Sequence, residues 1–381
     1  MSRPIFDDSH EAFRSVVRDF LAREATPKAD AWERAGTVDR DFLLRAGELG
    51  LLGMQAPSEY GGGGTSSFKY NAVVCEEIAK AHIALGSIRV HADIVLPYFL
   101  GLSTPAQRDR WLKNLTSGRA MSAIAMSEPG AGSDLAGIST RAVPEGDGFV
   151  LNGSKSFITN GRIADLVIVV VRTEMTDNRR EGLSLLVVEN GMPGFVRGRS
   201  LDKIGLKSQD TTDLFFDNVS VPRDNLLGTE GRAFEHLTAN LPQERLSIAV
   251  HSVAAARSAM EETIRYVKQR HAFGRPIASF QNTKFEIASV ATEIEAAQHL
   301  VDASVEQHDR RELTPAKAAM AKLFSTEVQG RTMDRCLQLF GGYGYTTEFP
   351  IAKMYADARV SRIYGGTSEV MKSIISKSVG L

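Results

Sequence analysis

The sequence has no long apolar run, few cysteines and no excess of either charge. No stretch approaches the roughly 20 consecutive apolar residues that cross a bilayer, so no membrane span is expected. Cys75 and Cys336 lie far apart, outside any Cys/His spacing typical of zinc, so we expect no disulfide, no bound metal and two small buried residues. The formal net charge of −1 gives no electrostatic reason to expect nucleic acid as a partner.

The N-terminal residues also lack the pattern of a targeting segment. M-S-R-P-I-F-D-D carries acidic side chains early and no uninterrupted apolar core. Hydrophobic residues make up 43% of the chain and charged residues 24%, which is typical of a globular protein. A cytoplasmic enzyme is therefore expected.

The 381 residues divide into three regions by periodicity. Residues 1–121 repeat apolar side chains every three to four positions, which predicts a helical domain. Residues 122–228 hold short β-branched runs and turn residues, which predicts a β-barrel or sandwich. Residues 229–381 return to the helical period and predict a four-helix bundle. The expected fold class is α+β multi-domain, in the order helical, β, helical.

Local signals place several turns and helix starts. Ser9 and Thr104 are expected helix N-caps, the second followed by proline at the first helical position. Gly146–Asp147–Gly148 and Asn152–Gly153 are typical of β-hairpin turns.

Two segments of the β region could hold a planar or phosphorylated ligand. M-S-E-P-G-A-G-S-D at 126–134 combines glycines, which allow close backbone approach, with the hydroxyls of Ser127 and Ser133. In N-G-S-K-S-F-I-T-N-G at 152–161, Phe157 can pack on a ring and Thr159 can donate to it. The alternative interpretation of these segments is an ordinary turn and a core aromatic residue.

Two further strings carry a resemblance to a known family. I-Y-G-G-T-S-E-V at 363–370 and L-P-Q-E-R-L at 241–246 resemble the acyl-CoA dehydrogenase family, closest to its long-chain branch. The order helical, β, helical is similar to that family over the whole chain. The resemblance implies an FAD enzyme that removes two hydrogens from an acyl thioester.

The resemblance assigns FAD contacts position by position. It implies contacts from the β region at Met126, Ser127, Ser133, Phe157, Ile158 and Thr159. It implies further contacts from the C-terminal region at Arg270, Phe273, Gln281, Gln338, Gly341, Gly342, Thr367 and Glu369. Phe157 stands where many relatives have tryptophan. In the family part of the C-terminal set reaches the FAD of a neighbouring subunit, so a homotetramer is expected.

The resemblance also identifies the catalytic positions. Most members have their catalytic glutamate where this chain has Gly365, while the long-chain branch has it where this chain has Glu244. Gly365 still supplies a backbone N–H for the thioester carbonyl. Arg245 matches an arginine associated with the CoA portion. The alternatives are that Glu244 is a dipole-stabilising acid in a first helical turn, or that Glu369 is the base.

The favoured function is α,β-dehydrogenation of acyl-CoA, with electrons passed to an electron-transfer flavoprotein. Three alternatives remain: the same reaction on an acyl carrier protein, an oxygen-using monooxygenase or oxidase, and a non-catalytic flavoprotein. The retained Glu244 argues against the monooxygenase and the non-catalytic protein. The acyl chain length is left open.

Overall fold

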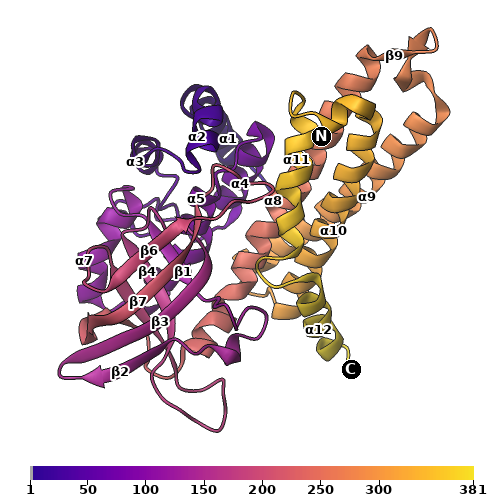
Figure 1. Ribbon diagram of the computed structural model, residues 1–381. Coiled ribbons are helices and arrows are strands. Elements are labelled where there is room, and N and C mark those ends of the chain that lie inside the picture. The colour runs from indigo at the N-terminus through magenta and orange to yellow at the C-terminus, as the bar shows by residue number, and fades with distance from the viewer. Residues whose placement is uncertain (1–2) are drawn as a thin grey trace.

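The N-terminal region is helical in the computed structural model, which describes residues 3–381 (Figure 1). Its helices are α1 (Asp8–Phe20), α2 (Ala29–Ala35), α3 (Arg40–Glu48), α4 (Lys69–Ala81), α5 (Gly86–Arg89), α6 (Leu96–Leu102) and α7 (Pro105–Thr116). Thr104 caps α7 as predicted, and it forms a reciprocal capping box with Gln107. The expected Ser9 cap is wrong. Because α1 starts at Asp8, two residues earlier than a Ser9 cap would place it, Asp7 is the cap, and its side chain accepts from the backbone N–H groups of Ser9 and His10.

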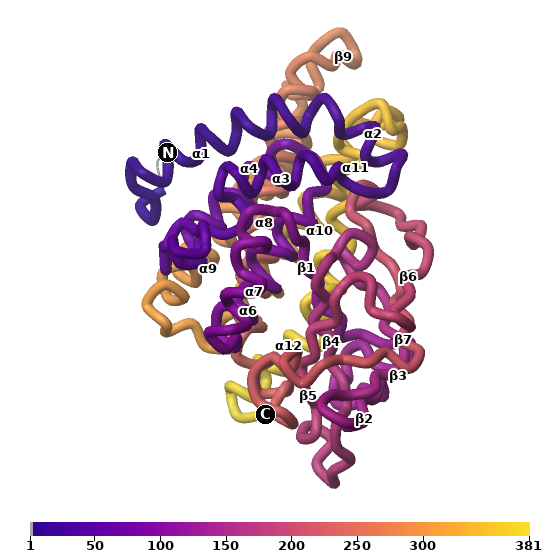
Figure 2. The backbone as a smooth tube through the Cα atoms, turned by 90° about the vertical axis from the view of Figure 1, so that its left-hand side faces the viewer, coloured from indigo at the N-terminus to yellow at the C-terminus, as the bar shows by residue number. Residues whose placement is uncertain are grey.

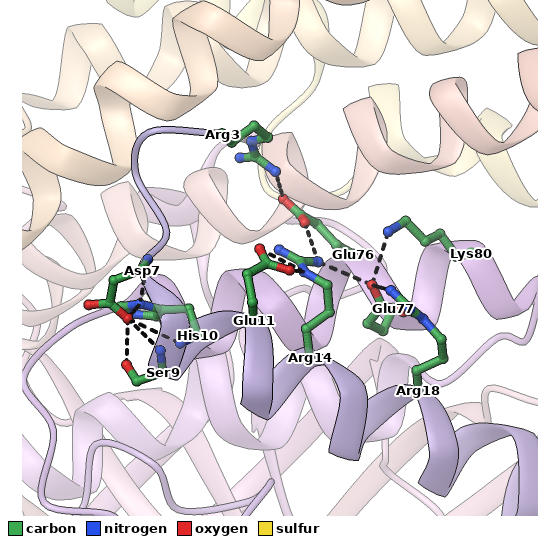
Figure 3. Close-up of polar contacts among 10 residues, drawn as sticks. All are labelled: Arg3, Asp7, Ser9, His10, Glu11, Arg14, Arg18, Glu76, Glu77 and Lys80. Atoms are coloured by element: carbon green, nitrogen blue, oxygen red, sulfur yellow. Dashed lines mark hydrogen bonds and ion pairs between the residues drawn. The ribbon is translucent and has the colours of Figure 1, made fainter. Parts of the chain in front are cut away.

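Buried ion pairs fasten α1 to α4 (Figure 3). Arg14 Nη1 lies 2.7 Å from Glu76 Oε2 and 3.1 Å from Glu77 Oε1, and Arg18 Nε lies 2.9 Å from Glu77 Oε2. Both glutamates are buried on α4. Since a buried carboxylate is costly without a partner, these arginines allow α4 to carry acidic residues in the interior.

The middle region is an eight-stranded sheet in the order β6-β7-β3-β2-β4-β5-β8, with β1 paired parallel to β4. Its strands are β1 (Ser122–Ala125), β2 (Arg141–Glu145), β3 (Gly148–Thr159), β4 (Leu166–Arg172), β5 (Leu183–Glu189), β6 (Phe195–Ser200), β7 (Thr211–Pro222) and β8 (Leu226–Leu227). On β4, Val167 and Val169 pack within the β region, whereas Leu166 and Ile168 pack against α6 and α7. This alternation follows from the two-residue period of a strand that is buried on both faces.

One predicted hairpin is present and the other is not. Glu145 pairs with Gly148 across the β2–β3 turn, as expected. The Asn152–Gly153 turn is wrong, because both residues lie inside β3, where the pairing with β7 shifts between Leu151 and Gly153. A glycine in a strand with a local register shift indicates a bulge, which bends the strand without ending it.

Long helices return after β8. They are α8 (Ala233–Gln269), α9 (Gln281–Asp309), α10 (Pro315–Phe340), α11 (Pro350–Ala358) and α12 (Ser368–Ser378), with the short strands β9 (His271–Ala272) and β10 (Arg275–Pro276) forming a hairpin between α8 and α9. α8 packs against α4, α9 and α10, so it joins the N-terminal helices to the bundle. α11 and α12 pack on α10. The three-region α+β fold is as predicted.

Both cysteines are free and buried, Cys75 on α4 and Cys336 on α10, as expected. Within residues 3–381, no helix combines the length and apolarity needed to cross a bilayer. The same described residues contain no cluster of His, Cys, Asp and Glu suited to a metal ion.

Candidate active site

Glu244 lies well inside α8. The helix begins at Ala233, about three turns before Glu244, so the dipole effect of a first turn does not explain this acid. Its Oε2 atom is buried and has no hydrogen-bond partner among the described residues. Burial raises the pKa of Glu244, although the charges of Arg245 and Lys322 oppose the shift. A buried carboxylate with a raised pKa and a free oxygen is a candidate proton acceptor.

A side chain at position 365 would point toward the carboxylate of Glu244. A Cβ built on Gly365 would lie 3.5 Å from Glu244 Oε1 and would collide with Ile248 Cδ1. Gly365 also has a φ of +62°, a left-handed conformation that favours glycine. The two positions singled out in the sequence, 121 residues apart, therefore meet beside one carboxylate.

Two buried cations hold the glycine pair. Lys322 Nζ donates to the carbonyl of Gly366 at 2.7 Å, and Arg245 Nε donates to the carbonyl of Gly365 at 3.4 Å. Burial lowers the pKa of Lys322 to about 8. With both carbonyls bound by cations, the orientation of the Gly365–Gly366 backbone is fixed beside Glu244.

Lys322 and Tyr98 are site residues that the sequence did not indicate. Lys322 is fully buried on α10 within A-M-A-K-L-F, where a lone lysine in an apolar helix is the only available signal. Tyr98 is 1% exposed, and its hydroxyl has no partner among residues 3–381. Burial and the charge of Glu244 raise the pKa of Tyr98.

The two ligand-binding segments of the β region lie against each other. Lys155 on β3 forms a buried ion pair with Glu128 at 2.8 Å and donates to the carbonyl of Met126 at 3.0 Å. The carbonyl of Ser127 accepts from the backbone N–H of Ser156 at 2.9 Å. The 126–134 loop is therefore fixed to β3 beside Phe157.

Side chains of this surface are available to a flat ligand. Phe157 is 70% exposed and has a φ of +61°, an uncommon conformation for an aromatic residue. Ile158 is buried beneath it, and Thr159 Oγ1 accepts from Gln209 Nε2 at 3.3 Å. Ser133 is exposed on a loop whose glycines face open space. An exposed ring, hydroxyl groups and uncrowded backbone fit the isoalloxazine and phosphate groups of FAD.

Residues of the C-terminal set line a second site, a groove of about 530 Å³ at the far end of the bundle. Its lining includes Arg270, Gln338, Gly341 and Gly342. The Arg270 guanidinium lies 5.5 Å from the centre of the Tyr343 ring, a cation–π contact. An arginine over an aromatic ring, facing a groove, fits the pyrophosphate and adenine of FAD.

The remaining predicted residues lie outside that groove's lining. Phe273 is 95% exposed and occupies the β9–β10 hairpin, and Gln281 is exposed at the start of α9. Thr367 caps α12 by accepting from the N–H of Val370, and Glu369 is exposed in the first turn of that helix. In Figures 1 and 2, the β9 hairpin lies at the opposite end of the molecule from β3. A single chain therefore does not bring the two predicted FAD surfaces together.

A helical bundle joined to a β region that presents this surface is the fold of a flavin-dependent dehydrogenase. Models of the acyl-CoA dehydrogenase N-terminal, middle and C-terminal domains match residues 7–119, 123–219 and 231–380. The chain belongs to the acyl-CoA dehydrogenase family, whose members depend on FAD.

Individual relatives agree with this assignment. The chain is 44% identical over 378 residues to "Long-chain specific acyl-CoA dehydrogenase, mitochondrial" of Mus musculus, covering 99% of this chain and 88% of the relative. The crystal structure of acyl-CoA dehydrogenase from Geobacillus kaustophilus has a TM-score of 0.98 and 43% identity, covering 100% of both chains. A glutaryl-CoA dehydrogenase from Mycobacterium smegmatis, solved in complex with FADH2, has a TM-score of 0.91 and 27% identity, covering 99% of this chain and 95% of that one.

Proposed function

We propose that the protein removes the α-proton and a β-hydride from an acyl-CoA, and that Glu244 is the base. One observation carries this proposal: the buried, unpaired carboxylate of Glu244 lies 3.5 Å from where a side chain at position 365 would begin. FAD, when bound, supplies the acceptor for the hydride. The products are the trans-2-enoyl thioester, a protonated Glu244 and the reduced cofactor.

The other residues orient the thioester. The N–H of Gly365 is the donor that we assign to the thioester carbonyl, where negative charge develops as the α-proton leaves. Lys322 and Arg245 fix the orientation of that N–H, because each donates a hydrogen bond to a carbonyl of the glycine pair. Arg245 is buried, and its predicted contact with the CoA portion remains a proposal.

In this assignment Met126, Ser127 and Ser133 hold the pyrimidine side of the flavin and the pyrophosphate, and Phe157, Ile158 and Thr159 hold its redox edge. The adenine half then belongs to Arg270, Phe273, Gln281, Gln338, Gly341 and Gly342 of a second copy of the chain, while Thr367 and Glu369 complete the first copy's site. Because this assignment needs residues of a second copy, we propose a homo-oligomer, specifically a homotetramer. We also propose that an electron-transfer flavoprotein accepts the electrons and that the protein acts in the cytoplasm.

An anaerobic titration of the purified holoprotein tests the proposal. The protein should be yellow and should be bleached by an acyl-CoA, without any added acceptor, in proportion to its flavin. Addition of an electron-transfer flavoprotein should then restore turnover. The titration is repeated with the same acyl groups on acyl carrier protein. Faster bleaching by these thioesters would identify acyl carrier protein, in place of CoA, as the carrier of the substrate. Holoprotein that stays oxidised with every thioester would refute the proposed function.

A further inference from the structure

A small closed-in cavity lies between the N-terminal helices and the bundle. Its volume is about 50 Å³, and its wall comes from α4, α5, α8, α10, α11 and the loop at 206–209. The polar side chains of its wall are those of His82, Arg89, Gln209, His251, Gln329, Asp357, Ser361 and Tyr364, so the wall carries a carboxyl group as well as the guanidinium. At about 15 Å³ for one water-sized group, the cavity has room for roughly three such groups.

The cavity lies farther along α8 than the proposed reaction centre. Glu244, Ile248 and His251 follow one another at helical spacing on α8, so they share a face of that helix. His251 lies about 10 Å beyond Glu244 along the axis. From the other side, Tyr364 adjoins Gly365. An acyl chain with its α-carbon at Glu244 that extends along α8 therefore ends at this cavity.

Arg89 is the charged residue of this cavity whose hydrogen bonding is incomplete. It is 8% exposed, and its Nη2 donates to Ser247 Oγ at 3.2 Å. Its Nε is buried without a hydrogen-bond partner among the described residues. A buried guanidinium with a free donor is costly, so it indicates a missing acceptor.

Asp93, an acidic residue near Arg89, does not accept from the free Nε of Arg89. Asp93 accepts from Ser247 Oγ at 2.6 Å, from Asn71 Nδ2 at 2.7 Å and from Cys75 Sγ at 3.2 Å. One hydroxyl therefore separates Asp93 from Arg89. The carboxylate is engaged by other donors, which leaves the Nε edge of the guanidinium for a group that enters the cavity.

We propose that the cavity receives an oxygen acceptor at the distal end of the acyl chain, held by Arg89. A terminal carboxylate suits it best, because a guanidinium offers parallel N–H donors to two oxygens, whereas a hydroxyl engages one. A plain alkyl end would occupy the same space and leave the charge unpaired. The inference rests on the proposed dehydrogenation and adds a preference for acyl thioesters with an oxidised end.

Matched substrates test it on the wild-type holoprotein. Octanoyl-CoA, ω-hydroxyoctanoyl-CoA and octanedioyl-CoA have the same length and differ only at the end. We expect kcat/KM for octanedioyl-CoA to exceed that for octanoyl-CoA at least tenfold, with the hydroxy compound between them. The same comparison with hexanoyl-CoA and decanoyl-CoA, each against its dicarboxylic partner, finds the chain length at which the distal end reaches the cavity.

Variants of Arg89 supply the second measurement. Arg89→Met keeps an apolar stem without charge and should reverse the preference, while Arg89→Lys should keep part of it. If the plain chain is used as well as its dicarboxylic partner at every length, the inference is wrong and Arg89 is structural; this comparison needs only wild-type protein. Absence of flavin reduction by all of these thioesters would instead refute the dehydrogenase function itself.

Discussion

At the scale of single residues, the proposed role of Glu244 as the base can be tested directly. Glu244→Gln keeps the shape of the side chain and removes the proton acceptor. We expect FAD content to be unchanged and the rate of flavin reduction to fall on the order of a hundred- to ten-thousand-fold, the usual cost of losing a positioned base. Stopped-flow reduction by an acyl-CoA measures this, and Glu369→Gln is the control. A nearly wild-type rate in Glu244→Gln, with a loss in Glu369→Gln, would transfer the role to Glu369.

The environment of Glu244 also fixes the pH dependence. Burial raises the pKa of Glu244 above its ordinary value of 4.5. Only the ionised form accepts a proton, so kcat/KM should fall as pH decreases through that raised pKa. We expect the acid limb of the wild-type profile to lie above pH 4.5. An acid limb with its midpoint at or below pH 4.5 would show that the base of the free enzyme is exposed to solvent and not buried as Glu244 is.

Gly365 allows the base to be moved. In Glu244→Gln with Gly365→Glu, the new side chain meets Ile248 Cδ1 and adopts a left-handed backbone, which costs about 1 kcal/mol. Adding Ile248→Ala removes the collision. We therefore expect flavin reduction to recover in part in the triple variant and not in Glu244→Gln/Ile248→Ala. An FAD-loaded triple variant without any recovery would mean that the two positions do not face one α-carbon.

The sequence alone indicated Glu244 and Gly365, because each lies in a string that departs from or matches a family pattern. Lys322, Tyr98 and Arg89 could not be found in that way. Each is a single polar residue in a helix whose sequence carries no other functional signal. What it contacts depends on which segment packs against that helix. Lys322 becomes a ligand of the Gly366 carbonyl only once α10 has packed beside the 363–367 turn.

At the scale of elements, periodicity predicted more than local turn chemistry. The helical apolar period of residues 229–381 predicted long helices there, and α9 and α10 agree with it, because long apolar stripes specify them. Asn152–Gly153 was wrong because a strand can absorb a turn-forming pair as a bulge when its neighbours stay paired. Such a choice depends on β7, about 60 residues away, and no local pattern contains it.

The Glu128–Lys155 pair holds the flavin-binding loop to β3. Although burial opposes the shift, hydrogen bonds from Lys155, Thr140 and Ser139 lower the pKa of Glu128 from 4.5 to about 2. Glu128→Gln leaves Lys155 buried without a counter-charge, so we expect a loss of about 3 kcal/mol in the free energy of unfolding and weaker FAD retention. Glu24→Gln is the control, since the Glu24–Arg45 pair is solvent-accessible and its loss should cost below about 1 kcal/mol.

The pH dependence of that loss identifies its cause. A lowered pKa in the folded state contributes stability that is present above the unfolded value and disappears as pH falls through the folded value. The difference between wild type and Glu128→Gln should therefore be fully present between about pH 4.5 and the pKa of Lys155 near 8, and shrink toward about pH 2 as Glu128 takes up its proton. Denaturant titrations at several pH values measure it, and a difference that does not change with acid would exclude the ion pair as its origin.

At the scale of the whole molecule, the two predicted FAD surfaces are far apart within one chain, so the proposed cofactor assignment calls for a second copy of the chain. Phe157, Ile158 and Thr159, the predicted redox-edge residues, lie on β3, and the β9 hairpin, which directly follows Arg270, lies at the opposite end of the molecule (Figure 1). Phe273 is 95% exposed on the β9–β10 hairpin, where its ring meets only the edge of Phe280 among the aromatic rings of the described residues, and such exposure is unusual for a large apolar side chain. Both observations have one explanation if the hairpin and groove meet the β region of a neighbouring subunit.

Arg270→Ala tests that explanation through two properties at once. It should reduce the FAD retained during purification and shift the protein toward smaller species, because the cofactor would bridge the subunits. Light scattering with flavin absorbance measures both, and Arg199→Ala, an exposed substitution on β6, should change neither. If the flavin lay within one chain, Arg270→Ala would leave occupancy intact and wild-type holoprotein would persist as a monomer. A bridging cofactor instead makes occupancy and assembly rise together as FAD is added back to apoprotein, since each FAD bound stabilises the interface that completes its own site.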